Sequence, residues 1–135
     1  MKRLLAAAAL LALATPLGAK DTYPPVELLF QTETTVIGEP LVYPEGTPQI
    51  TSAIVTMQPG QVTGWHRHQA PLVAYVLEGE ITVDYGPAGV KVYGVGDSFV
   101  EALQSRHNGS NTGDGIARIL AIFAGAEGVA NTVAE

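Results

Sequence analysis

The stretch "GQVTGWHRH", Gly60 to His68, says more about the fold and the site than any other part of the chain. In a β-strand, residues two apart point to the same face, so His66 and His68 would lie side by side while Arg67 points away. Two such imidazoles can bind one divalent ion at about 2.0–2.1 Å. The alternative is two solvated histidines. The pair alone does not decide between these interpretations, so the rest of the chain must.

Short segments rich in Val, Ile, Tyr and Phe follow residue 19, and turn residues such as Gly86-Pro87-Ala88-Gly89 separate them. This pattern is typical of strands, and no long helical period interrupts it. Seven or more strands at this spacing predict an all-β fold, a small antiparallel sandwich or barrel. The tail, residues 125–135, is expected to be either a docked helical turn or a loose end. The predicted strands are Val26–Gln31, Thr51–Met57, Leu72–Leu77, Glu80–Tyr85, Val90–Tyr93, Ser98–Glu101 and Ile116–Phe123.

The first nineteen residues have the layout of a bacterial secretory signal peptide. Lys2 and Arg3 precede an apolar run from Leu4 to Leu13, which is too short to span a bilayer. Small residues follow, and we expect cleavage after Ala19 because Pro16 ends the apolar helix just before it. The alternative is a retained N-terminal anchor helix. Cleavage predicts a periplasmic or secreted protein, with residues 20–135 as a single domain and no stable membrane insertion afterwards.

The charge and the composition exclude several classes of protein. The whole chain has a net charge of −6, and removal of Lys2 and Arg3 leaves 5 basic against 13 acidic residues, a net −8. Phosphate backbones would repel such a chain, so nucleic acid is not an expected partner. The chain has no cysteine, which rules out disulfides, thiolate nucleophiles and cysteine-ligated metals.

A second motif downstream matches the first. The segment "GDSFVEALQSRHNGSN" places Gly96, Asp97, His107 and Asn111 at fixed distances. With Gly60, His66, His68 and Gly79, these residues resemble the two motifs of the cupin superfamily over about residues 50–123. The resemblance implies a double-stranded β-helix, which is a small jelly-roll barrel.

The three family ligand positions hold His66, His68 and His107, the only histidines in the chain. The resemblance therefore implies one divalent transition metal, which could be Fe, Mn, Ni, Cu or Zn, because ligand type alone discriminates poorly among them. The alternative is a degenerate cupin whose histidines serve packing.

The chain departs from the family pattern in three places. Leu72 stands where the family keeps a glutamate, and Ala102 and Gln104 replace the proline and glycine of the second motif. Either three histidines and water complete the site, or a carboxylate arrives from elsewhere. Glu101 is the candidate, as ligand or proton acceptor, because it shares a strand face with Phe99, which is expected in the core. The alternative places Glu101 in solvent at the end of its strand.

Five further residues are candidates for the site, and each could instead have an ordinary core or surface role. Trp65 and Tyr75 could line a ligand pocket or belong to the core. Gln69 and Gln104 are candidate donors near the metal or surface residues. Arg106 could bind a substrate carboxylate, although a solvated or Glu-paired charge is the simpler interpretation.

The resemblance is to small single-domain cupins of the quercetin-dioxygenase-like group. It implies a metal-dependent, dioxygenase-like oxidoreductase acting on an oxygen-bearing small molecule, with Glu101 as the catalytic candidate. Two alternatives stay open, a non-catalytic metal or ligand binder and a structural dimer module, because one barrel serves many chemistries. A homodimer would also fit the apolar residues on both faces of Val73–Leu77.

Overall fold

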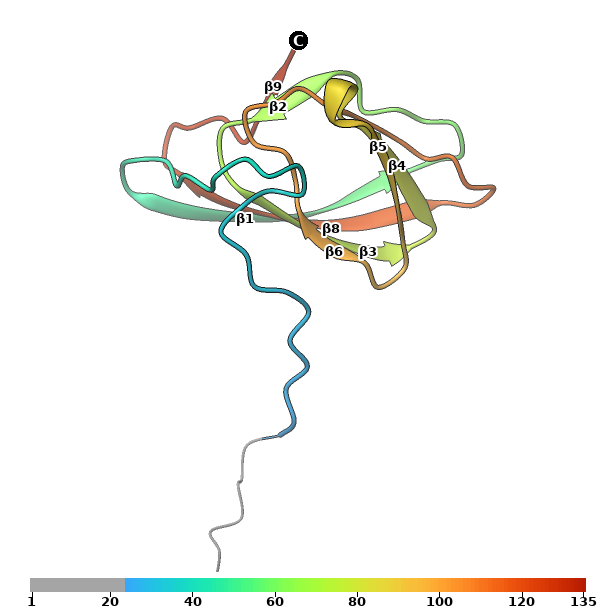
Figure 1. Ribbon diagram of the computed structural model, residues 1–135, viewed down its shortest axis with the longest axis horizontal. Coiled ribbons are helices and arrows are strands. Elements are labelled where there is room, and N and C mark those ends of the chain that lie inside the picture. Colours follow the sequence, from blue (N-terminus) through green and yellow to red (C-terminus); the bar gives the residue numbers. More distant parts are fainter. Residues whose placement is uncertain (1–23) are drawn as a thin grey trace, which may run out of the picture.

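Antiparallel β-strands form nearly all of the regular structure in the computed structural model, which describes residues 24–135 (Figure 1). The predicted signal peptide, residues 1–19, lies outside the described residues. The one helical segment within 24–135 is the 3-10 turn Gly86–Ala88, and no helix there is long and apolar enough to cross a membrane.

The strands form three sheets. A four-stranded sheet has the order β1-β8-β3-β6, a three-stranded sheet has the order β5-β4-β7, and β2 pairs with β9. The long strands β1 and β8 pair over ten residues, from Pro48 opposite Ala126 to Met57 opposite Ala117. The bounds are β1 Pro48–Met57, β2 His66–His68, β3 Leu72–Glu78, β4 Glu80–Asp84, β5 Val90–Gly94, β6 Ser98–Val100, β7 Asn108–Ser110, β8 Ala117–Ala126 and β9 Thr132–Ala134.

Alternating side chains build the core between the two larger sheets. In β3 the residues Leu72, Ala74 and Val76 are buried, and in β4 Ile81 and Val83 are buried, as a period of two requires. Tyr93 stacks on Phe99 inside, with ring centroids 3.7 Å apart. The all-β sandwich or barrel predicted from the strand spacing is therefore confirmed, in the form of the small jelly roll that the resemblance implies.

Gly79 joins β3 to β4 at a position where only glycine fits. Its φ is +69°, in the left-handed region, and a Cβ there would lie 2.5 Å from the Ile116 carbonyl oxygen. The close crossing of the two sheets depends on this glycine, which the first motif supplies.

The predicted strand Val26–Gln31 is wrong. The segment has no ladder partner within the described chain and runs away from the body below β1 and β8 (Figure 1). Val26, Leu28 and Leu29 are 74%, 71% and 56% exposed. Local β-propensity made the prediction, and the absence of a partner edge within residues 24–135 overrides it.

Both expectations for the tail are also wrong. The strand predicted to end at Phe123 continues to Ala126, and residues 132–134 form β9 instead of a helical turn or a loose end. β9 pairs with β2, placing Thr132 opposite His68 and Ala134 opposite His66. Thr132 and Val133 are β-branched, and the short β2 offers them a free edge.

The outer face of the four-stranded sheet carries apolar side chains. Ile50 and Ile54 of β1 are 67% and 49% exposed, and Tyr75 of β3 lies opposite Leu120 of β8. This is the face that the expected homodimer would bury, and the homodimer stays a prediction.

Candidate metal centre

His66 and His107 are direct cross-strand partners. The His66 amide donates to the His107 carbonyl at 3.0 Å, and the His107 amide donates to the His66 carbonyl at 2.8 Å. His68, two residues along β2, points to the same side as His66, as the strand period requires. Two separate parts of the sequence thus bring three imidazoles together.

The three rings form one compact cluster. Their centroids lie 4.4–5.0 Å apart, and one nitrogen from each ring lies within 4.8 Å of the other two. His68 and His107 are 3% and 1% exposed, and His66 is half-buried. Three imidazoles at this spacing can enter the coordination sphere of one ion.

Backbone carbonyls fix the tautomer of all three histidines. The Nδ1 atoms of His66, His68 and His107 lie 2.8, 3.0 and 3.0 Å from the carbonyl oxygens of Gly64, Asn131 and Ser105, respectively. A carbonyl can only accept, so each Nδ1 carries the proton and each Nε2 keeps a free lone pair. This is the arrangement that metal-binding histidines use.

His107 Nε2 is the one buried side-chain polar atom of residues 24–135 that has no hydrogen-bond partner. A buried acceptor without a partner costs roughly 1–3 kcal/mol unless something binds it. A metal ion would satisfy this lone pair together with those of His66 and His68. The donor set fits one divalent transition metal, in agreement with the sequence prediction.

Burial keeps the three imidazoles neutral. It lowers the pKa of His68 to about 4, with the nearby His107 adding to the effect. Burial also lowers the pKa values of His66 and His107, although the hydrogen bonds to Gly64 and Ser105 partly oppose it. Neutral imidazole is the form that binds a metal.

We expect the metal-free protein to lose stability as the pH falls from about 6.5 toward 4. The unfolded histidines titrate near 6.5, so in this window the unfolded state binds more protons than the folded state. His68 alone contributes at most about 3 kcal/mol, because one pKa unit corresponds to about 1.4 kcal/mol. Burial raises the pKa of Glu101, which acts in the opposite direction, so the histidine effect is measured in the Glu101→Gln variant, where this carboxyl is absent. Urea unfolding in chelator at pH 7 and pH 5 measures the difference, and equal stabilities would contradict the prediction.

A cavity of about 410 Å³ opens beside the three histidines. Its walls are largely apolar, and Leu72, Phe99 and Phe123 are among them. Neither lysine nor arginine appears among its lining residues. The cavity therefore suits a mostly apolar molecule that brings its own oxygen atoms to the metal.

Glu101 lines this cavity and is only 7% exposed, which rules out the alternative that it lies in solvent. Its amide donates to the Leu72 carbonyl at 2.9 Å, so it sits beside the position where the family keeps a glutamate. One carboxylate oxygen accepts from the Ala102 amide at 2.8 Å. Glu101 is not in the three-histidine group. Burial raises its pKa, although the neighbouring Tyr85 hydroxyl and Ala102 amide lower it in part.

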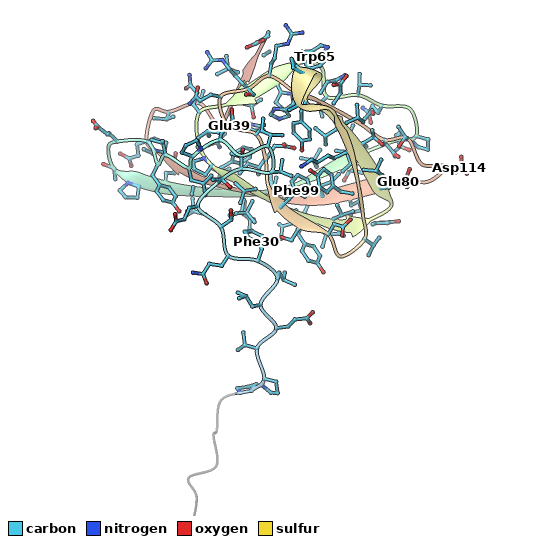
Figure 2. The ribbon with its side chains drawn as sticks, viewed as in Figure 1. Phe30, Glu39, Trp65, Glu80, Phe99 and Asp114 are labelled. Atoms are coloured by element: carbon cyan, nitrogen blue, oxygen red, sulfur yellow. The ribbon has the colours of Figure 1, made fainter. Side chains whose placement is uncertain are left out.

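Of the further candidate residues named from the sequence, one lines the cavity and the others lie outside it. Trp65 lines the cavity and lies near the β2 end of the body, above Phe99 (Figure 2). The Arg106 guanidinium lies 4.5 Å from the centre of the Trp65 ring and 3.9 Å from Glu135 at an exposed position. Tyr75, Gln69 and Gln104 are not among the cavity residues, and both glutamines are exposed.

Sequence reasoning missed Tyr85 and the tail. Tyr85 is 2% exposed, and its ring lies tilted by 38° to that of His107, with centroids 5.9 Å apart. Its hydroxyl lies 3.1 Å from that of Tyr93. Thr132 and Ala134 of β9 and the following Glu135 line the cavity. The sequence around a buried tyrosine shows only that its neighbours are apolar, so its place near the site cannot be predicted. β9 cannot be predicted either, because residues 132–134 form a strand only by pairing with the free edge of β2.

The family model described as "Cupin domain" matches residues 53–123. The chain therefore belongs to the cupin family, as the two motifs indicate. No curated protein matches the chain.

Solved structures agree with this assignment. An uncharacterized conserved protein with a double-stranded β-helix domain from Klebsiella pneumoniae is 20% identical, with a TM-score of 0.55 over 69% of this chain and 84% of its own. Lactobacillus farciminis oxalate decarboxylase is 24% identical, with a TM-score of 0.54 over 63% and 26%. Bacillus subtilis oxalate decarboxylase, which has Mn(II) centres, is 27% identical, with a TM-score of 0.52 over 63% and 23%. The chain thus spans about a quarter of the length of these decarboxylases.

Proposed function

We propose that the protein is a metal-dependent cupin enzyme acting on a mostly apolar, oxygen-bearing small molecule. One observation carries the proposal: three Nε2 lone pairs converge on a cavity that also contains a buried carboxylate. A metal bound by His66, His68 and His107 would supply a Lewis acid or a redox centre. The similarity to oxalate decarboxylases supports metal-dependent chemistry on small molecules.

Glu101 is the proposed proton-holding group. Its raised pKa brings proton exchange closer to neutral pH, where a general acid or base works best. Burial also raises the pKa of Tyr93, to about 12, and that of Tyr85, so both hydroxyls keep their protons at neutral pH. Tyr85 can therefore donate a hydrogen bond to the ionised carboxylate.

The cavity walls favour one class of substrate. A dicarboxylate such as oxalate would find no lysine or arginine among the lining residues to balance its second charge. An enol, a flavonol or a related hydroxyl compound would place its carbon skeleton against Phe99, Phe123 and Leu72 and its oxygens toward the histidines. We propose that the substrate belongs to this class of hydroxyl compounds and that the reaction is a dioxygenase-like oxidation. Oxalate is the less suitable substrate.

We expect Glu101→Gln to reduce turnover by about 10²–10⁴-fold while changing metal affinity less than tenfold. Glutamine keeps the shape and the acceptor for the Ala102 amide but cannot take up the proton. Oxygen consumption and product formation with enols, flavonols and small acids, including oxalate, measure the rate. The control is Glu127→Gln, an exposed glutamate outside the cavity.

The panel also separates the alternatives. If the metal-loaded protein turns over no member, the non-catalytic binding protein is the better description. If Glu101→Gln retains the full rate, Glu101 is not the proton acceptor. A tenfold or greater loss of metal affinity would make it a metal ligand or a direct support of one.

We also propose that the chain is exported, with cleavage after Ala19. The support for this is the pattern of the first nineteen residues alone.

A further inference from the structure

Glu39 lies far from the histidines in sequence but holds the loop that leads to His107. It precedes β1 on a segment that crosses the side of the body (Figure 2). Its Oε2 accepts from the Leu103 amide at 2.7 Å, and its Oε1 accepts from the Ser105 amide at 2.7 Å and the Gln104 amide at 3.2 Å. Three consecutive backbone donors therefore converge on one carboxylate.

The carboxylate is itself held in place. The Thr35 hydroxyl lies 3.2 Å from Glu39 Oε2 and also accepts from the Glu39 amide at 3.1 Å. The Val36 amide donates to the Val100 carbonyl at 2.8 Å, which fixes this segment against β6. Burial alone would raise the pKa of Glu39, but the hydrogen bonds from Leu103 and Ser105 lower it overall. Glu39 is therefore ionised at neutral pH, and hydrogen bonds to a charged acceptor are the stronger kind.

The loop that Glu39 holds supports two of the three histidines, the ring of His107 and the backbone of His68. Ser105 donates its amide to Glu39, and its carbonyl, which belongs to the next peptide group, accepts from His107 Nδ1 at 3.0 Å. The Leu103 carbonyl accepts from the His68 amide at 2.9 Å. Rotation of these peptides would change the direction in which His107 Nε2 points.

Glu39 holds the turn in which the chain departs from the second motif. Ala102 and Gln104 stand where the second motif has a proline, which fixes φ, and a glycine, which allows a tight turn. Neither replacement fixes the backbone by itself. The three hydrogen bonds to Glu39 hold the same turn from outside.

We propose that Glu39 is a positioning residue of the metal centre, which fixes the backbone of the Leu103–Ser105 turn and through the backbone of Ser105 orients His107 Nε2 into the cavity. The role rests on the proposed function, because an oriented Nε2 matters only if it binds a metal. Glu39 does not touch the metal or the substrate in this scheme.

The test compares Glu39→Gln with Glu33→Gln, the same change at an exposed glutamate on the same segment. Glutamine offers one oxygen, and its amide group would point a donor at backbone donors. We expect Glu39→Gln to weaken Zn²⁺ or Co²⁺ binding by about 10–100-fold, as loss of a group supporting a ligand does, and Glu33→Gln to leave it unchanged. Competition with a chromophoric chelator measures the affinity.

A second readout does not need a metal. Long-range ¹H–¹⁵N NMR of the metal-free protein reports which ring nitrogen of His107 carries the proton. Wild-type protein should show the Nδ1–H form alone, and Glu39→Gln should show a mixture. A variant destabilised elsewhere in the core, Val76→Ala, should show neither the mixture nor the affinity loss, because its effect is on packing.

Several outcomes would overturn the inference. One is unchanged affinity and an unchanged His107 tautomer in Glu39→Gln; another is an equal affinity loss in Val76→Ala. If wild-type protein binds no metal, the proposed function fails, whereas the NMR comparison still decides whether Glu39 orients His107. If Glu39→Gln does not fold, Glu39→Asp replaces it, and an aspartate variant with wild-type affinity and tautomer would sink the proposal.

Discussion

Replacing His107 with alanine is expected to abolish tight metal binding. One of the three Nε2 donors is lost, and the remaining pair on β2 is the weak His-x-His site of an isolated strand. We expect the affinity to fall by more than the roughly 100-fold that marks the loss of an outer supporting group. The metal-induced rise in melting temperature should vanish with it. For wild-type protein at metal concentrations of 100 Kd, that rise corresponds to about 2.7 kcal/mol.

The control for this experiment is Gln104→Ala, an exposed residue on the same loop. It removes only an interaction with Arg67 at 3.5 Å and should bind metal as wild-type protein does. Calorimetric titration and melting with and without metal measure both effects. Full affinity in His107→Ala would show that the unpaired Nε2 is not a metal ligand.

The second large effect is on folding. Asn111→Ala is expected to destabilise the protein by about 2–6 kcal/mol, because it leaves the carbonyl of the buried Met57 without its partner, at roughly 1–3 kcal/mol, and removes two further hydrogen bonds, at roughly 0.5–1.5 kcal/mol each. Asn111 is 1% exposed. Its Nδ2 donates to the Met57 carbonyl at 2.9 Å and the Gly115 carbonyl at 2.8 Å, and its Oδ1 accepts from the Gly113 amide at 3.0 Å. These bonds tie the turn before β8 to the end of β1.

Asn108→Ala provides the matched control. Asn108 is half-buried, and its side chain makes one long contact, 3.4 Å, with the Thr63 hydroxyl. Thermal or urea unfolding of the metal-free variants compares the two. A melting temperature for Asn111→Ala no lower than that for Asn108→Ala would contradict the structural role of Asn111.

Local sequence patterns could predict the strands that pack one face against the core between the two larger sheets. Segments rich in Val, Ile, Tyr and Phe between turn residues identified the strands of an all-β barrel, and the alternating burial of β3 and β4 agrees with them. The same reasoning failed at Val26–Gln31, where an apolar pattern has no partner edge within the described chain. It missed β9, because Thr132–Ala134 becomes a strand only against the free edge of β2.

Part of the site could be predicted from the sequence and part could not. The spacing of the two motifs brought His66, His68 and His107 together, and the face shared with Phe99 carried Glu101 inward. The hydrogen-bond partners of the rings could not be predicted, because they are backbone carbonyls of Gly64, Ser105 and Asn131. Any residue type supplies a carbonyl, so sequence has no signal for it. Glu39 was missed for the same reason: its partners are backbone amides more than sixty residues away.

The most direct test of the central claim is the metal content and metal-dependent stability of the wild-type protein. Protein purified from its own compartment, or loaded with a divalent metal and dialysed, is analysed for bound elements and melted with and without chelator. The three converging histidines predict close to one transition metal ion per chain and a lower melting temperature in chelator. A metal-free protein whose melting temperature does not change in chelator or with added metal would contradict the account.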